Sequence, residues 1–452
     1  MTTFTIHALR VGASDQSEST FSYDNQTSTL LRADGTPVIA SKPLQFGDAA
    51  VVSVDQPGRK GVIKTLKISL GLSCNYECGY CSQRFVPHAE ETNPGNVASF
   101  LEQLTSALTK PPQRIEFWGG EPFVYWKTLK PLAEALRARY PDAAFNIITN
   151  GSLLDLEKNA WLERMGFGVG LSHDGPGYHA RGVDPLDDPK KREAIMDLWA
   201  RLRPKGRMSV NAMMHRDNQS RAEVQSWLQA RFGQDAPIGE GAYIDPYDEG
   251  GMAAVLRDPA EHLLYRARAF TEIRQGRVGN FKIARQKIQG FIDSIRNQRP
   301  ASAVGQKCGM DRPDTVAVDL AGNVITCQNV SAAATAPNGE AHQIGHLADI
   351  SRVAMKTATH WSQRPDCSSC PVLQLCQGSC MFLEGPLWEA GCNSAYSDNV
   401  PFFAAAIEFL TGFTPYYIEG EFRDDRKDLF GRVRGVPATK QKRVIEIHAV
   451  PA

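Results

Sequence analysis

Between about residue 63 and residue 297 the chain alternates strand-like and helix-like segments, and this alternation constrains its fold more than any other feature. Each short apolar run that suits a strand is followed by a stretch with apolar residues at helical spacing. Six such units in series imply a parallel sheet, because each helix carries the chain back to the start of the next strand. The sequence therefore predicts an α/β fold, either an incomplete barrel or an open doubly wound sheet.

The individual elements follow from the same patterns. Strands are expected at 66–70, 114–118, 144–149, 168–172 and 208–213, with a sixth near 243–244. Helices are expected at 97–108, 129–139, 156–165, 190–202, 221–232, 258–275 and 283–296.

Three further segments flank this region. Residues 1–62 form a β-rich N-terminal extension, with expected strands at 3–11 and 28–39 and a hairpin signal at Asp34-Gly35. After the α/β region of 63–297, residues 298–398 are rich in turns and cysteine. Residues 399–452 contain an apolar helix at 402–410 and a tail of mixed charge, in which 444–450 is expected to pair with the first strand.

Charge and hydropathy exclude several classes of partner. Lys and Arg together number 50, as do Asp and Glu, so no overall field favours nucleic acid or an acidic membrane. The apolar run 400–407 is far too short to cross a bilayer, and no secretory signal opens the chain. We expect a cytoplasmic protein with neither nucleic acid nor membrane as a partner.

The ten cysteines are clustered rather than scattered. Three lie between residues 74 and 81 and seven between 308 and 392. Cytosolic thiols are kept reduced, which disfavours disulfides, and clustered thiolates in such a protein indicate metal. The first group, Cys74, Cys78 and Cys81, follows the first strand of the expected sheet, where parallel folds place their chemistry. A zinc knuckle is the alternative, but zinc takes four ligands and no nearby His or Cys completes the set.

The segment Cys74-x3-Cys78-x-Tyr80-Cys81 resembles the motif of radical S-adenosylmethionine (SAM) enzymes. The resemblance implies a partial (β/α)6 barrel, like an incomplete TIM barrel, in which the three cysteines hold a 4Fe-4S cluster. One iron of that cluster has no protein ligand and binds SAM, with Tyr80 near the adenine. After the second strand, the sequence resembles the family's GGEP motif, which implies contacts to the SAM amino group from Gly119, Gly120, Glu121 and Pro122.

Two more strand ends carry polar segments. Asn146 and Asn150, at the end of the third strand, resemble residues that contact the SAM ribose, although Thr149-Asn150-Gly151 is equally a plain turn. Ser172 and His173 begin a segment similar to the SxDGP motif of anaerobic sulfatase-maturing enzymes, in which His173 is a candidate acid–base group. In the polar, aromatic stretch 240–249, Tyr243 and Asp245 are candidates on the substrate side, with a surface loop as the alternative.

The second cysteine group resembles the SPASM domain of enzymes that mature peptides and proteins. Cys308 is followed after thirteen residues by Gly322 and after four more by Cys327, and Cys367-x2-Cys370-x5-Cys376-x3-Cys380 precedes Cys392. The resemblance implies two auxiliary 4Fe-4S clusters. One is held by four cysteines, Cys367, Cys370, Cys376 and Cys392, and the other by Cys308, Cys327 and Cys380.

The three-cysteine cluster lacks the eighth cysteine of the sulfatase-maturing pattern. Asp311 and Asp314 occupy that stretch, so the cluster takes a carboxylate ligand, for which Asp314 is the candidate, or keeps an open iron. Both residues are alternatively ordinary turn residues.

The resemblance implies a peptide maturase that cleaves SAM reductively to a 5′-deoxyadenosyl radical and abstracts a hydrogen from a ribosomally made peptide. The product is an oxidative modification, such as a thioether, C–C or C–O crosslink. Its partners are the precursor peptide or protein and a flavodoxin- or ferredoxin-type reductant. The alternatives are a maturase that oxidises Cys or Ser to formylglycine, a peptide epimerase, and a non-enzymatic iron–sulfur carrier or zinc-binding interaction module.

Overall fold

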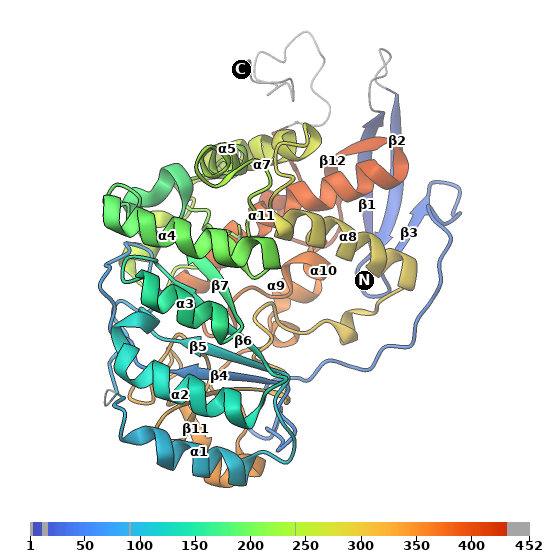
Figure 1. Cartoon of the computed structure of the whole chain (residues 1–452). Coiled ribbons are helices and arrows are strands. Elements are labelled where there is room, and N and C mark those ends of the chain that lie inside the picture. Colours follow the sequence, from blue (N-terminus) through green and yellow to red (C-terminus); the bar gives the residue numbers. More distant parts are fainter. Residues whose placement is uncertain (1–2, 11–16, 90–91, 240, 432–452) are drawn as a thin grey trace.

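A computed structural model describes residues 3–10, 17–89, 92–239 and 241–431. Its centre is an eight-stranded sheet with the order β11-β10-β9-β4-β5-β6-β7-β8 (Figure 1). Five consecutive members are parallel and form the expected α/β core: β4 (Thr65–Ser69), β5 (Arg114–Trp118), β6 (Ala144–Thr149), β7 (Phe167–Ser172) and β8 (Met208–Asn211). The predicted parallel α/β fold is confirmed.

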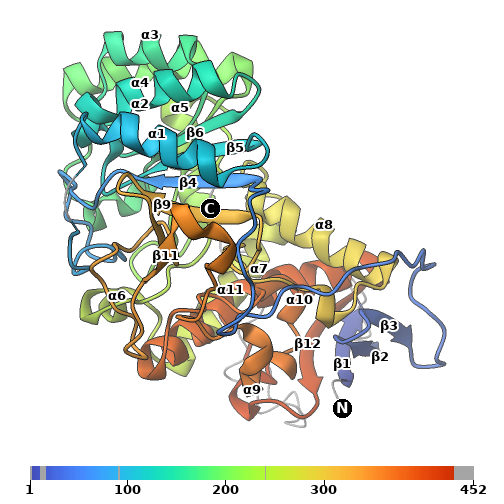
Figure 2. The same ribbon diagram turned by 90° about the horizontal axis from the view of Figure 1, so that it is seen from below.

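The strands alternate with helices, as the apolar spacing predicts. These are α1 (Asn96–Ala107), α2 (Trp126–Arg139), α3 (Leu156–Arg164), α4 (Pro189–Leu202), α5 (Arg221–Phe232), α6 (Glu249–Ala254), α7 (Pro259–Arg274) and α8 (Lys282–Asn297). Figure 2 shows α1 to α4 on one side of the sheet and α7, α8 and α11 on the other. Along β5 to β8 buried residues alternate with partly exposed ones, so one face of these strands packs in the core and the other, which carries Glu116, Asn146 and Asn211, is less tightly covered.

The expected sixth strand near 243–244 is reduced to isolated parallel bridges. Met214 pairs with Tyr243, and Ile238 pairs with both Val210 and Phe281. Gly239 and Gly241 lie between Ile238 and Tyr243 and disfavour a longer ladder, since glycine in a strand loses packing and backbone entropy.

The cysteine-rich region contributes strands to the same sheet. Strand β9 (Thr315–Asp319) runs parallel to β4, with Leu66 opposite Val316 and Ile68 opposite Val318. Strands β10 (Asn323–Ile325) and β11 (Gln343–His346) continue the sheet antiparallel. The helices of this region are short, α9 (Pro365–Ser368) and α10 (Leu373–Cys376), before the long α11 (Gly385–Thr411). The helix expected at 402–410 is the C-terminal part of α11.

A second, four-stranded sheet has the order β12-β1-β2-β3 and joins the two ends of the chain. Its strands are β1 (Thr3–Arg10), β2 (Glu18–Asp24), β3 (Thr29–Arg32) and β12 (Phe413–Glu419). The strand expected at 28–39 is too long, because the chain turns at Asp34-Gly35, where Gly35 has a φ of 80°. Both edges of β1 are occupied, by β12 and β2, while the segment 444–450 lies outside the described residues.

Among the described residues, no helix is both long and apolar enough to cross a membrane.

Candidate active site

A pocket of about 370 Å³ opens at the carboxyl ends of the parallel strands. Loops that follow consecutive strands meet there, because parallel strands end at the same edge of the sheet. Most residues predicted to contact SAM or substrate line it: Cys74, Cys78, Tyr80, Cys81, Gly119, Gly120, Glu121, Pro122, Asn150, Ser172, Tyr243 and Asp245. The structure thus gathers predicted residues that are up to 171 positions apart in sequence.

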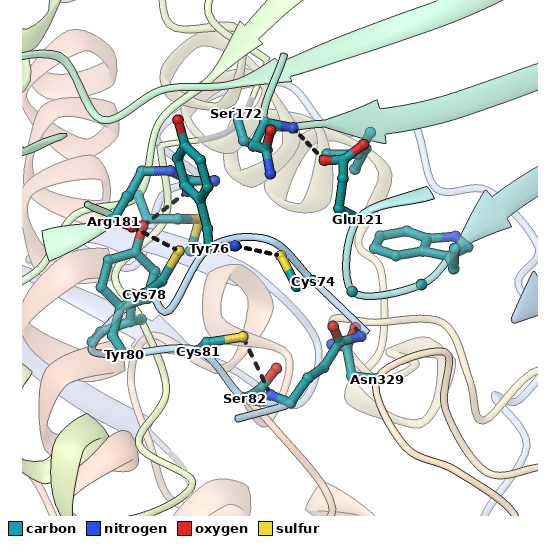
Figure 3. Close-up of a pocket in the computed structure, with 18 of the residues that line it drawn as sticks. Cys74, Tyr76, Cys78, Tyr80, Cys81, Ser82, Glu121, Ser172, Arg181 and Asn329 are labelled. Carbon is teal, nitrogen blue, oxygen red and sulfur yellow. Dashed lines mark hydrogen bonds between the residues drawn. The ribbon is translucent and has the colours of Figure 1, made fainter. Parts of the chain in front are cut away.

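The first three cysteines lie on one short loop after β4 (Figure 3). The amide of Tyr76 donates to Cys74 Sγ at 3.4 Å, and the amide of Gln83 donates to Cys81 Sγ at 3.4 Å. Burial raises the pKa of Cys78 to about 11, an effect that the nearby Arg181 opposes. Amide donors aimed at sulfur favour the thiolate form, which is the form that binds metal.

Tyr80 is held by two charged residues beneath the cysteine loop. Its hydroxyl donates to Asp174, and Arg181 Nη1 donates to the Tyr80 oxygen at 3.1 Å. Burial, and then the charge of Asp174, raise the pKa of Tyr80 well above its ordinary value. The phenol therefore stays neutral, and its ring has a fixed position in the pocket beside His215, whose ring centroid is 5.4 Å away.

Glu121 joins the ends of two strands. One carboxylate oxygen accepts hydrogen bonds from the amide of Phe123 at 3.1 Å and from Thr149 Oγ1 at 2.8 Å. The other accepts from the amide of Asn150 at 2.8 Å. Burial raises the pKa of Glu121 against these hydrogen bonds. The close approach of this loop requires glycine at Gly120, where a Cβ would lie 2.4 Å from the Leu72 and Ser73 carbonyl oxygens.

His173 and Asn146 are not among the residues that line the pocket. The His173 side chain is 2% exposed, with Nε2 3.0 Å from Asp184 and Nδ1 accepting from the amide of Gly175 at 3.1 Å. Its ring stacks on Trp227, at 4.5 Å between centroids. Both nitrogens are engaged, so His173 supports the turn after β7 while its neighbour Ser172 faces the pocket. Asn146 lies within β6, opposite Gly168.

Tyr243, Asp245 and Tyr247 lie at and after the position expected for the sixth strand, and all three line the pocket. Tyr243 is buried, and its hydroxyl has no hydrogen-bond partner among the described residues. Asp245 accepts from Ser379 Oγ at 2.6 Å and lies 3.9 Å from Lys307 Nζ. Tyr247 reaches further and donates to Cys380 Sγ at 3.2 Å. This loop therefore connects the pocket with the cysteine-rich region.

The remaining cysteines lie near one another in two sets. Within the first, burial raises the pKa of Cys308 to about 12 and of Cys327 to about 11; the negative charge of Cys327 adds to the effect at Cys308, and that of Cys380 to the effect at Cys327. Tyr247 contacts the third thiol, Cys380, whose pKa burial also raises to about 12. Thiols that raise one another's pKa lie close enough for their charges to interact.

The second set has four members. Burial raises the pKa of Cys370 to about 12 and of Cys376 to about 11, and Cys392 adds to both shifts. The pKa of Cys367 is raised by burial and then by the charges of Cys376, Cys392 and Cys370. The thiols that raise one another's pKa are the same three and four that the resemblance to SPASM domains implies, and the two clusters themselves stay a prediction.

Asp314 is engaged away from these thiols. It lies 3.0 Å from Lys64 Nζ and accepts from Arg312 Nε at 3.1 Å. Burial opposes these two contacts, which nevertheless hold its pKa below the ordinary value. Asp311, by contrast, is 1% exposed and contributes to the raised pKa of Cys308. One of its carboxylate oxygens accepts from the amide of Gln306 at 2.9 Å, while the other has no partner among the described residues.

The donor sets fit iron–sulfur clusters, because thiolates are the protein ligands of such clusters and none of the ten cysteines is in a disulfide. Within the described ranges, no three Cys, His, Asp or Glu side chains converge closely enough to hold a single metal ion.

Some pocket residues have no signal in the sequence. Arg181, the partly buried partner of Tyr80, follows the turn after β7 by several residues and belongs to no pattern. Lys307 and Asn329 line the pocket from the cysteine-rich region, and only the tertiary fold brings them there.

Comparison with known proteins supports the resemblance. The radical SAM cyclopropyl synthase TigE of Paramaledivibacter caminithermalis is 23% identical over 171 residues, covering 34% of this chain and 36% of that protein. The S-adenosylmethionine-dependent nucleotide dehydratase of Pseudoalteromonas ulvae is 28% identical over 170 residues, covering 32% of this chain and 54% of that protein. The matched region thus spans about a third of the first curated relative and about half of the second. No family model matches the chain.

Among solved structures, native anSMEcpe with bound AdoMet and the Kp18Cys peptide has a TM-score of 0.54 at 17% identity. The alignment covers 76% of this chain and 98% of that chain. The two proteins share their fold over the aligned part of the chain. The predicted resemblance to radical SAM enzymes is confirmed.

Proposed function

We propose that this chain is a radical SAM enzyme that modifies a peptide or protein oxidatively. The observation that carries the proposal is the convergence of the Cys74, Cys78 and Cys81 loop with the GGEP turn in one pocket at the strand ends. Cys74, Cys78 and Cys81 would hold a 4Fe-4S cluster with one iron free to bind SAM, and the reduced cluster with SAM would supply the radical chemistry that removes a hydrogen atom from the substrate.

The chain's own residues position the reactants. The Glu121 carboxylate and the neighbouring backbone suit the SAM ammonium, since a buried carboxylate binds an ammonium strongly. Tyr80, fixed by Asp174 and Arg181, provides a flat surface for the adenine. Asn150 and Ser172 supply polar contacts, and the enclosing loops exclude water from the radical.

Asp245 is the candidate base on the substrate side. It lines the pocket, and Ser379 and Lys307 hold its carboxylate in place. In an oxidative product, the substrate loses a proton as well as a hydrogen atom and an electron, and Asp245 is placed to accept that proton. The two auxiliary cysteine sets provide a route for the electron, which supports a crosslink over epimerisation.

The substrate class rests on the relatives. The anSMEcpe structures contain AdoMet and a peptide, and the SPASM-like cysteine pattern points to the same substrates. We therefore assign a cytoplasmic maturase with three 4Fe-4S clusters, a precursor peptide or protein as substrate and a flavodoxin- or ferredoxin-type reductant. Formylglycine formation is the second candidate, because anSMEcpe shares the fold over 98% of its length.

Anaerobic reconstitution tests the proposal. Three clusters predict about twelve irons per chain, and reduction with SAM should yield 5′-deoxyadenosine. The Cys74→Ala/Cys78→Ala/Cys81→Ala variant should retain about eight irons per chain and form no 5′-deoxyadenosine. Incubation with a peptide encoded beside this chain should then remove two hydrogens from it, whereas an epimerase would incorporate solvent deuterium without oxidation. Absence of 5′-deoxyadenosine from the wild type would refute the enzyme assignment.

A further inference from the structure

The two auxiliary cysteine sets have different electrostatic surroundings. Acidic residues adjoin the three-cysteine set: Asp311 raises the pKa of Cys308, and Asp245 raises that of Cys380 after the larger effect of burial. Three cations that act on this set each have another partner: Lys67 lies 3.9 Å from Glu116, Arg59 donates to the Met310 carbonyl oxygen at 2.6 Å, and Arg364 donates to the Leu383 carbonyl oxygen at 2.7 Å. The hydrogen bonds to the sulfur atoms come from neutral groups, the Tyr247 phenol to Cys380 at 3.2 Å and the Asn329 amide to Cys327 at 3.4 Å.

The four-cysteine set has a buried cation on one of its sulfur atoms. Arg426 is 4% exposed, and its Nη2 donates to Cys392 Sγ at 3.2 Å and to Asn393 Oδ1 at 2.8 Å. The guanidinium lies 4.9 Å from the Tyr396 ring centroid, and the Tyr396 hydroxyl donates to the Arg426 carbonyl oxygen at 2.6 Å. The side chain is therefore fixed against the sulfur from two directions.

A guanidinium stays protonated in proteins, and a buried charge needs a counter-charge. Asn393 is neutral, so Cys392 is the group in direct contact that supplies negative charge when it is a thiolate ligand. Other cations stand further from the sulfur atoms. Lys287 and Lys307 line a cavity of about 310 Å³ with Cys376, but Lys287 lies 3.3 Å from Asp398.

Hydrogen bonds and positive charge at the ligand sulfurs stabilise the more negative, reduced form of a cluster and raise its reduction potential. We propose that Arg426 holds the four-cysteine cluster at a higher reduction potential than the three-cysteine cluster. The electron taken from the substrate then moves in one direction, from the three-cysteine cluster to the four-cysteine cluster. This inference rests on the proposed function and adds a residue that sets the reduction potential of one cluster.

The positions of the two sets agree with that direction. Tyr247 and Asp245 line the main pocket and adjoin Cys380 of the three-cysteine set. The cysteines of the four-cysteine set do not line the main pocket; Cys376 lines the cavity of about 310 Å³ that shares Tyr243 and Lys307 with it. The charges of Cys380 in the first set and of Cys367 and Cys392 in the second all act on Arg364.

The electron and proton balance is simple. The substrate loses one hydrogen atom to the deoxyadenosyl group, and closing the new bond releases one proton and one electron. Asp245 accepts the proton. With both clusters bound, the electron would pass to the one held by Cys308, Cys327 and Cys380, then to the one held by Cys367, Cys370, Cys376 and Cys392, and finally to an external one-electron acceptor of the flavodoxin or ferredoxin type.

A redox titration of the reconstituted protein, followed by electron paramagnetic resonance, tests the inference. The signal that disappears in the Cys367→Ala/Cys370→Ala variant identifies the four-cysteine cluster. Arg426→Gln should lower its midpoint by about 59 mV or more, which is a tenfold change in electron partition, and leave the three-cysteine cluster unchanged. Arg426→Lys, which keeps the charge, should show a smaller shift.

Arg423→Gln is the matched control, because Arg423 lies in the same turn but pairs with Asp425 at 3.2 Å and Glu389 at 3.5 Å. It removes the same charge and should move neither midpoint. An unchanged midpoint in Arg426→Gln, an equal shift of both clusters, or a wild-type four-cysteine midpoint below the three-cysteine one would overturn the inference. If Arg426→Gln fails to hold iron, the inference is tested instead by the order of the reduction midpoints of the two auxiliary clusters in Arg426→Lys. Wild-type protein with only about four irons would instead refute the auxiliary clusters of the proposed function, and this inference with them.

Discussion

A buried charge network ties the helices behind the main pocket together, and its disruption has a calculable cost. Asp398 on α11 accepts from Arg221 Nη2 at 2.5 Å and from the Tyr265 hydroxyl at 2.6 Å, with Lys287 Nζ at 3.3 Å. The side chains of Asp398 and Arg221 are 3% and 2% exposed. The network therefore joins α5, α7 and α8 to the helix that carries Cys392.

Asp398→Asn preserves the shape of the side chain but leaves Arg221 and Lys287 without their shared carboxylate. Removal of one partner from a buried pair costs about 3–5 kcal/mol, because the remaining charge is uncompensated. The urea dependence grows with chain size, and at about 3–5 kcal/mol per molar the unfolding midpoint should fall by about 1 M. Arg221 and Lys287 also hold the pKa of Asp398 below its ordinary value despite burial, so this stabilisation is present above about pH 4 and is lost as pH falls further.

Urea unfolding of the reconstituted protein, followed by tryptophan fluorescence, measures the change. Asp293→Asn on α8 is the control, since Asp293 lies 3.2 Å from Arg296 and both side chains are more than 40% exposed. Such a pair contributes about 0–1 kcal/mol. A midpoint for Asp398→Asn equal to that of Asp293→Asn would refute the reasoning, because it would mean that water or relaxation compensates the buried cations.

Three further predictions concern the pocket and its supports. Glu121→Gln should weaken SAM binding at least tenfold by calorimetry, because the variant lacks the charge that meets the ammonium and turns an amide toward a backbone donor; unchanged affinity would remove Glu121 from the SAM site. Burial lowers the pKa of His342 to about 4, so stability should fall by up to about 3 kcal/mol as pH drops from 6.5 to 4, where the unfolded chain binds the extra proton. That slope should flatten in His342→Gln, and an identical pH profile would contradict it. Asn25→Ala should cost about 1–3 kcal/mol and reduce iron retention, since its side chain donates to the Ser368 and Cys370 carbonyl oxygens; iron content equal to wild type would show that the N-terminal sheet does not support the cluster loop.

Local patterns in the sequence predict the central elements closely. Strands 114–118 and 144–149 and helix 221–232 match β5, β6 and α5, because each has clear apolar spacing and a distinct boundary. The sequence does not predict strand β2, because its residues Glu-Ser-Thr-Phe-Ser-Tyr-Asp are mostly polar and only two of them are buried. The pairing of β1 with β12 joins residues about 400 positions apart, and local periodicity carries no information about pairing over such a separation.

The residues of the candidate site likewise fall into those that the sequence predicts and those that only the folded structure reveals. Cysteines, glycines and Glu121 stand in fixed spacings that a sequence displays, and the structure brings them to one pocket. Arg181 and Arg426 contact Tyr80 and Cys392 because of the way in which distant loops pack, which no local pattern predicts. His173 adjoins a motif in sequence, yet the turn after β7 directs its ring toward Trp227 and Asp184. Spacing predicts which residues share a loop, whereas packing decides which way each side chain points.

The parallel pairing of β4 with β9 has a consequence for dissecting this protein. Strand β4 lies between β5 and β9, so the cysteine-rich region supplies half of its hydrogen-bonding partners. A fragment ending at residue 297 would present β4 as a bare edge of apolar residues, the kind of surface that recruits other chains into aggregates. The accessory region is thus not a detachable module, and shuffling it between relatives requires that the borrowed piece bring a compatible β9.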